Sequence, residues 1–117
     1  MRTYRELQVW QKSMLLVNRI YDITKKLPKE ETYALSDQMR RAVISIPSNI
    51  SEGYGRGSNK DYMHFLSIAK GSVNELDTQL RAAIMLNFVS KNDCEEALSL
   101  CDECGRMLWS MIQHFHT

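Results

Sequence analysis

Residues 40–57, RRAVISIPSNISEGYGRG, decide the fold, because they combine a helical apolar pattern with a proline that an ordinary helix interior avoids. The apolar side chains recur three and four residues apart, at Met39, Val43, Ile46, Ile50 and Gly53. Pro47 removes the hydrogen bond that the carbonyl of Val43 would accept, at a cost of about 3 kcal/mol in a helix interior. We predict a buried helix from about Thr32 to about Glu52, kinked at Pro47.

An amphipathic helix precedes this stretch, from about Tyr4 to Lys26. Its apolar residues form one row at Leu7, Trp10, Met14, Val17 and Tyr21, and a second row at Leu16, Ile20, Ile23 and Leu27. Two rows predict contact with more than one neighbouring helix. Pro28 ends the helix, because a proline disfavours the α conformation of the residue before it.

Two further helices follow, and each begins with a capping signal. Ser58 with Asp61 starts the third, and Ser90 with Asp93 starts the fourth. The third has apolar positions at Tyr62, Leu66, Ala69, Val73, Leu76, Leu80 and Ala83. The fourth has them at Ala97, Cys101, Cys104, Leu108, Met111 and Phe115. Residues 87–89 form a short connection between these two helices.

Long helices with short connections predict an all-α fold, an antiparallel up-and-down four-helix bundle. The chain has 117 residues, 44% hydrophobic and 25% charged, so we expect a single domain covering residues 1–117. No apolar run approaches the roughly 20 residues that span a bilayer, and the N-terminus lacks the apolar core of a signal peptide. We expect a cytoplasmic protein that does not bind a membrane.

Catalytic and metal sites are not indicated. Glu52 and Glu75 are acidic, but no histidine or nucleophile is tied to them by spacing, so we expect no catalytic residue and no enzyme. Cys101 and Cys104 have the spacing of metal ligands, yet both occupy core positions of the fourth helix, and a zinc site needs four ligands. His114 and His116 lie at the C-terminal end, where fraying is common. We expect neither metal nor cofactor.

Charge is unevenly distributed along the chain. Residues 1–60 contain eleven Lys and Arg against six Asp and Glu, whereas residues 61–117 contain four against eight. Three interpretations remain open. The two halves neutralise each other within one bundle, basic and acidic faces pair between subunits, or a basic face attracts nucleic acid.

Basic residues near the glycine-rich stretch Gly53-x-Gly55-x-Gly57 are the candidates for phosphate contacts. Arginine and lysine bind phosphates without sequence specificity, and the glycines free the turn between the second and third helices. The alternative is a solvated face with one structural arginine. The candidate nucleic-acid-binding residues are Arg40, Arg41, Arg56 and Lys60, with Lys12 and Arg19 from the first helix.

A polar network is also predicted beside the apolar face of the second helix. Arg41 and Glu52 share one polar stripe of this helix, and Asn49 lies between that stripe and the apolar one. Glu75 lies on one flank of the third helix, where it could pair with Arg41. The network of Arg41, Asn49, Glu52 and Glu75 would fix the register of the two helices rather than perform chemistry.

Three segments together resemble a known family. They are RRAVISIPSNISEGYGR, YRELQVWQKSMLLVNRIYDITKKLP and FLSIAKGSVNELDTQL, and they closely resemble the bacterial 23S rRNA intervening-sequence proteins, relatives of the accessory protein of diversity-generating retroelements. The resemblance implies an antiparallel bundle that assembles as a homopentamer, with nucleic acid as a ligand and without known enzymatic activity. The family motif maps onto Arg40, Arg41, Ser45, Pro47, Ser48, Asn49, Glu52, Gly53 and Glu75.

Two functions of different classes follow as expectations. The first is a non-enzymatic oligomer that binds RNA or DNA phosphates through a basic surface of a homo-oligomeric ring. The second is a protein-interaction scaffold that recruits a partner, such as a reverse transcriptase or another nucleic-acid-processing enzyme, without binding nucleic acid itself.

Overall fold

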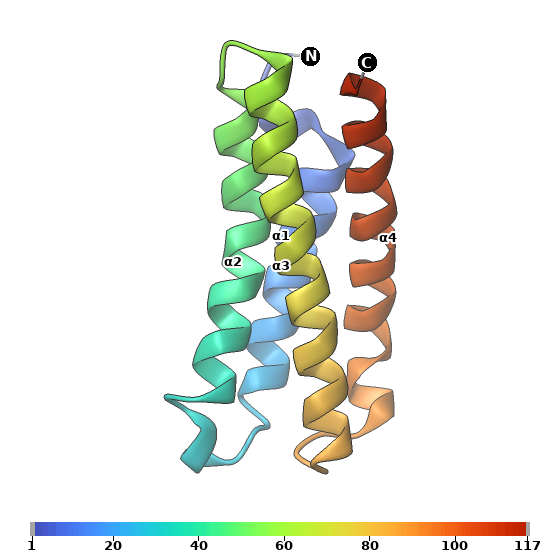
Figure 1. Cartoon of the computed structure of the whole chain (residues 1–117). Coiled ribbons are helices and arrows are strands. Elements are labelled where there is room, and N and C mark those ends of the chain that lie inside the picture. The colour runs from blue at the N-terminus through green and yellow to red at the C-terminus, as the bar shows by residue number, and fades with distance from the viewer. Residues whose placement is uncertain (1, 117) are drawn as a thin grey trace.

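A computed structural model describes residues 2–116, which form an all-α, antiparallel up-and-down four-helix bundle of 44 × 22 × 21 Å (Figure 1). The helices are α1 (Gln8–Thr24), α2 (Leu35–Tyr54), α3 (Asn59–Met85) and α4 (Lys91–Phe115). Short 3-10 turns at Tyr4–Glu6 and Lys29–Glu31 precede α1 and α2. α1 and α3 each pack against both α2 and α4. Both chain ends and the α2–α3 turn lie at one end of the bundle.

The predicted starts of α3 and α4 are confirmed. The Ser58 hydroxyl accepts a hydrogen bond from the backbone N–H of Asp61 at 3.1 Å. Ser90 and Asp93 form a complete capping box, with bonds of 3.0 and 3.3 Å. These bonds satisfy backbone donors that the first helical turn leaves without partners.

The starts of α1 and α2 differ from the prediction. α1 begins at Gln8 rather than near Tyr4, because Leu7 has an extended backbone with φ −70° and ψ 128°. α2 begins at Leu35, because Ala34 has φ −120° and ψ −104°, outside the helical region. The apolar spacing predicted the helices, but it does not reveal these local interruptions.

The core lies along the centre of the bundle. The predicted apolar faces of α2, α3 and α4 are buried except at their ends nearest the termini, where Tyr62, Met111 and Phe115 are half-buried. In α1 the second predicted row forms the core, since Leu16 and Ile20 are fully buried, whereas Met14 in the first row is 42% exposed. No helix formed by residues 2–116 combines the length and apolar character that a membrane span requires.

Two unusual residues of α2 have different roles. α2 continues as one helix through Pro47, which is buried, and a kink there remains a prediction. Gly53 lies within α2 rather than in the turn. A β-carbon at this position would lie 2.8 Å from the Phe65 β-carbon and 3.0 Å from Tyr62 Cδ1. Close approach of α2 and α3 therefore explains Gly53, which corrects its assignment to turn flexibility.

Candidate nucleic-acid interface

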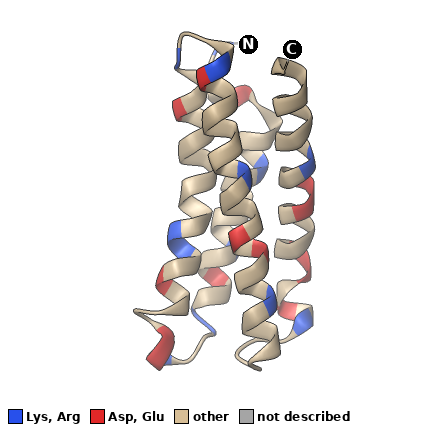
Figure 2. Ribbon diagram, viewed as in Figure 1, with Lys and Arg blue, Asp and Glu red and all other residues tan. Residues whose placement is uncertain are grey.

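The predicted phosphate-binding residues occupy three separate parts of the bundle. Lys12 and Arg19 belong to α1, and Arg40 with Arg41 to the first half of α2. Arg56 and Lys60 flank the turn between α2 and α3. Basic and acidic positions are interspersed along the helices instead of separating into a basic and an acidic side of the bundle (Figure 2).

Ion pairs join α1 to α4. Their nitrogen–oxygen distances are 2.7 to 3.0 Å, and the cations are spaced seven residues apart. Two of the cations lie on one side of α1, and the third follows the end of that helix. The pairs are Lys12–Glu103, Arg19–Glu96 and Lys26–Asp93. Helices from the basic and acidic halves thus neutralise each other within one bundle, which was one of the predicted interpretations.

The ion pairs shift the pKa values of two of their members in the direction that favours the charged form. The hydrogen bond and the charge of Glu103 raise the pKa of Lys12 above its ordinary value. Hydrogen bonds from Lys26 and Ser90 lower the pKa of Asp93. Lys12 and Arg19 are therefore already engaged by carboxylates of the same chain.

The two neighbouring arginines of α2 differ in environment. Arg40 is half-buried and its Nε donates to the Thr24 hydroxyl at 3.2 Å, while its guanidinium carbon lies 5.8 Å from the centroid of the Tyr21 ring. Arg40 therefore joins α2 to α1. Arg41 is 79% exposed and pairs with Asp37, one turn earlier, at 2.9 Å.

The predicted network of Arg41, Asn49, Glu52 and Glu75 does not form, because nearer partners are available on α2. Arg41 pairs with Asp37 and Glu52 pairs with Arg56, while Glu75 is exposed and has no ion pair within residues 2–116. Both partners lie four residues away in the chain, within α2 for Arg41 and in the turn after α2 for Glu52, so these pairs form without crossing to α3.

A smaller polar network links α2 to α3 instead. The Asn49 Nδ2 atom donates to the carbonyl and the hydroxyl of Ser45, at 2.8 and 2.9 Å. The Ser45 hydroxyl lies 2.8 Å from the hydroxyl of Ser72 on α3. Asn49 is thus part of an interhelical network, but the partners are serines and not charged residues.

The end of the bundle that holds both termini is built on an aromatic cluster. Tyr62 of α3 lies against Tyr54 of α2 and Phe115 of α4, with ring centroids 6.2 and 5.0 Å apart. Leu7 and Met111 line the same hollow of about 430 Å³. The residues before α1, the α2–α3 turn and the end of α4 are therefore held close together.

Four exposed basic residues belong to the segments at this end of the bundle, and we call them the basic end: Arg2, Arg5, Arg56 and Lys60. Arg56 pairs with Glu52 at 2.6 Å and lies 4.8 Å above the Phe65 ring. The side chains of Arg2, Arg5 and Lys60 have no ion pair within residues 2–116.

Arg2 and Arg5 were missed by the sequence interpretation. They are more than fifty positions from Arg56 along the chain, and only closure of the bundle brings them to the same end. The available signal was topological, since an up-and-down bundle places the chain start beside the second connection.

The three cysteines belong to the core of α4. Cys94, Cys101 and Cys104 are buried free thiols. Burial raises the pKa of Cys101 to about 12 and that of Cys104 to about 11, so both remain protonated. Within residues 2–116, no group of three or more His, Cys, Asp or Glu is placed to hold a metal ion.

Comparisons with known proteins agree with this fold. The chain is similar to the crystal structure of a protein of unknown function from the S23 ribosomal protein family of Bacteroides thetaiotaomicron VPI-5482. The TM-score is 0.82 at 28% identity, covering 89% of this chain and 97% of the other. No curated protein matches the chain. The family model described as 23S rRNA-intervening sequence protein matches residues 5–110, so the chain belongs to that family.

Proposed function

We propose that the chain is a non-enzymatic, self-associating bundle that binds nucleic-acid phosphates through the basic end. One observation carries the proposal: Arg2, Arg5 and Lys60 are exposed at one end of the bundle and have no ion pair within residues 2–116. Lys12 and Arg19, by contrast, are held by carboxylates of α4. Contact with a phosphate is most favourable for cations without an ion pair, because no existing pair must first be broken.

Arg56 adds a positioned guanidinium to this surface. Its contact with the Phe65 ring limits its orientations while leaving 45% of the side chain exposed. An exposed pair such as Arg56–Glu52 contributes little stability, so phosphate can replace the carboxylate at small cost. Such contacts confer affinity but no sequence preference.

An exposed apolar face supports self-association. Met14 and Tyr21 lie two turns apart on α1, and Ile44 lies one turn after Arg40, whose guanidinium contacts Tyr21. The three are 39 to 43% exposed. A ring built through this α1–α2 face, a pentamer by the family resemblance, would repeat the basic end in every subunit and strengthen its local potential.

The experiment measures fluorescence anisotropy of a labelled RNA and of a labelled DNA duplex while protein is added at increasing salt. We expect binding at low salt that weakens by about 0.9 logarithmic units per phosphate contact for each tenfold rise in salt on duplex DNA. The variant Arg56→Gln with Lys60→Gln should bind more weakly and have a shallower salt slope.

The matched control is Lys29→Gln with Lys91→Gln, which removes the same charge at the opposite end of the bundle. Both lysines are exposed and have no ion pair within residues 2–116. Equal losses in the two variants would show a general charge effect, which contradicts the proposal. Absence of binding at low salt would also contradict it.

A scaffold function is the second candidate, favoured by apolar side chains at the end opposite the basic end. Tyr33 is 93% exposed, Met85 77% and Leu86 53%, and they lie in or beside the α1–α2 and α3–α4 connections, which meet at this end (Figure 1). Recruitment of a purified nucleic-acid-processing enzyme should then survive Arg56→Gln with Lys60→Gln. It should be lost with Met85→Ser and Leu86→Ser.

A further inference from the structure

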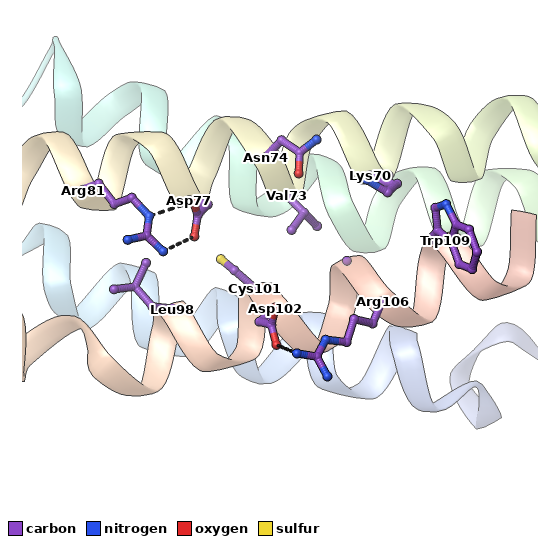
Figure 3. Close-up of a pocket in the computed structure, with 11 residues that line it drawn as sticks. Lys70, Val73, Asn74, Asp77, Arg81, Leu98, Cys101, Asp102, Arg106 and Trp109 are labelled. Atoms are coloured by element: carbon purple, nitrogen blue, oxygen red, sulfur yellow. Dashed lines mark hydrogen bonds and ion pairs between the residues drawn. The ribbon is translucent and has the colours of Figure 1, made fainter.

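An open groove runs between α3 and α4, away from the basic end. Its volume is about 580 Å³, within the range of small-ligand sites. Val73 and Cys101 line its inner side, and Lys70, Arg106 and Trp109 line one part of its length (Figure 3). No sequence expectation assigned a role to Lys70, Arg106 or Trp109.

Gly105 keeps the middle of the groove open. This residue lies inside α4, where glycine lowers helix stability relative to alanine. A β-carbon there would meet only Val73 Cγ1 at 3.8 Å, an ordinary contact, so packing within the bundle does not require glycine. The missing side chain instead leaves space in the groove.

Trp109 provides a flat apolar surface, with 57% of the residue exposed. Lys70 lies toward the same end of the groove and has no ion pair within residues 2–116. The Arg106 and Asp102 side chains, paired at 2.9 Å, are 80% and 61% exposed, so a competing anion can take the guanidinium readily. An aromatic plane therefore adjoins two available cations.

We infer that this groove binds an unpaired base of single-stranded nucleic acid, with the base stacked on Trp109 and its phosphates at Lys70 and Arg106. Bases of any type stack on an aromatic ring, whereas paired bases in a duplex are not free to do so. The cations of the groove outnumber its carboxylates, and Asp77 and Asp102 each already hold an arginine. An anionic ligand fits this charge pattern better than a neutral or basic one.

The inference rests on the proposed function and extends it along α3. Lys60 at the basic end and Lys70 in the groove are ten residues apart, a rise of about 15 Å. A single strand of a few nucleotides covers that distance. The basic end would therefore hold the backbone, and the groove would select single strands over duplexes.

The first test uses tryptophan fluorescence. The chain has two tryptophans, so Trp10→Phe leaves Trp109 as the only reporter. The probes are single-stranded oligothymidylate, a DNA duplex of equal length, and heparin, a polyanion without bases. We expect oligothymidylate to quench the Trp109 emission, and the duplex and heparin to leave it nearly unchanged.

Affinity measurements by anisotropy supply the second test. Trp109→Ala should lower the affinity for oligothymidylate by about five- to 150-fold, the range for loss of one stacked base, and leave duplex affinity unchanged. Gly105→Met should also lower single-strand affinity, because it fills the groove without removing a charge or the indole. Gly71→Met is the control, since a β-carbon at Gly71 meets no atom within 4 Å and Gly71 does not line the groove.

The outcomes separate this inference from the proposed function. If oligothymidylate binds the wild type, Trp109→Ala and Gly105→Met equally, the groove is not the site, although the basic end still binds nucleic acid. Equal quenching by duplex and single strand overturns the selection of unpaired bases. If neither oligothymidylate nor the duplex binds the wild type, the proposed function and the inference both fail.

Discussion

The hydroxyl oxygens of Ser45 and Ser72 lie 2.8 Å apart across the interface of α2 and α3. Ser45 also accepts a hydrogen bond from Asn49, so three polar side chains are joined within an otherwise apolar interface. Because these hydrogen bonds are short and Ser72 is only 9% exposed, the contact between Ser45 and Ser72 specifies one register of the two helices.

Removal of either serine hydroxyl should destabilise the bundle. Ser72→Ala leaves the Ser45 hydroxyl with one partner fewer, and we expect a loss of about 1 kcal/mol in the free energy of unfolding. Ser45→Ala should cost more, since Asn49 loses a partner as well. A double-mutant cycle from urea denaturation measures the coupling, and additive effects of the two substitutions would contradict a direct bond.

Replacement by alanine should have opposite effects on stability at Gly53 and at Gly71. Gly53→Ala places a β-carbon 2.8 Å from the Phe65 β-carbon, so we expect a loss of about 1 to 3 kcal/mol from overpacking. Gly71→Ala meets no atom within 4 Å and should stabilise α3 by about 1 kcal/mol through helix propensity. Urea denaturation of both variants provides the comparison, and equal stabilisation would refute the close approach at Gly53.

Stability should fall in alkaline solution because of the buried thiols. Their pKa values in the folded state, about 12 for Cys101 and about 11 for Cys104, lie above the ordinary value of 9.0. The unfolded chain thus releases these protons first, so the stabilising contribution is complete below pH 9 and is lost as the pH rises toward 11 to 12.

Each thiol contributes at most about 1.4 kcal/mol per pH unit to the slope of the unfolding free energy against pH. Cys101→Ala should lower stability at neutral pH, because it leaves a cavity, and make the decline above pH 9 shallower. Guanidinium denaturation across this pH range measures the slope, and an unchanged slope in the variant would show that Cys101 is not responsible.

The ion pairs between α1 and α4 should respond to charge exchange. Arg19→Glu opposes the Glu96 carboxylate and should cost up to about 1 kcal/mol at low salt, because the pair is exposed. The double variant Arg19→Glu with Glu96→Arg should recover most of that loss. Thermal unfolding at low and high salt tests both points, since screening should reduce the difference.

Self-association through the α1–α2 face should be sensitive to a buried charge. Ile44→Lys places an ammonium group in the proposed contact between subunits, while Ile44 is 43% exposed in the single chain, so folding should tolerate it. Light scattering should give an oligomer for the wild type and a monomer for the variant. Ile68→Lys, with Ile68 40% exposed on α3, is the control and should leave the oligomer intact.

Apolar periodicity was sufficient to predict the four helices and most of their buried faces. The starts at Ser58 and Ser90 were correct, because a capping signal is local in sequence. The start of α1 was wrong by several residues, since nothing in the spacing of Leu7 and Trp10 shows that Leu7 is extended. Helix boundaries depend on backbone angles that side-chain spacing does not encode.

The candidate site was harder to predict, because charge placement depends on distances between helices. Lys12 resembles a free basic residue in the sequence, yet Glu103 of α4 pairs with it. Arg2 and Arg5 attracted no notice, yet the start of the chain, which carries them, lies at the same end as the α2–α3 turn, which carries Arg56. The position of Asn49 between the polar and apolar stripes of α2 predicted it as a network member, but only the packed interface identifies Ser72 as the member on α3.

The ion pairs between α1 and α4 join the first long helix to the last, and Arg19 and Glu96 are 77 residues apart in the chain. During synthesis, α1, α2 and α3 are complete before Glu96 and Glu103 leave the ribosome. The bundle therefore closes only after translation of α4, and until then Lys12 and Arg19 lack their carboxylate partners. Order of synthesis thus leaves these two cations unpaired in the nascent chain until the last helix has been made.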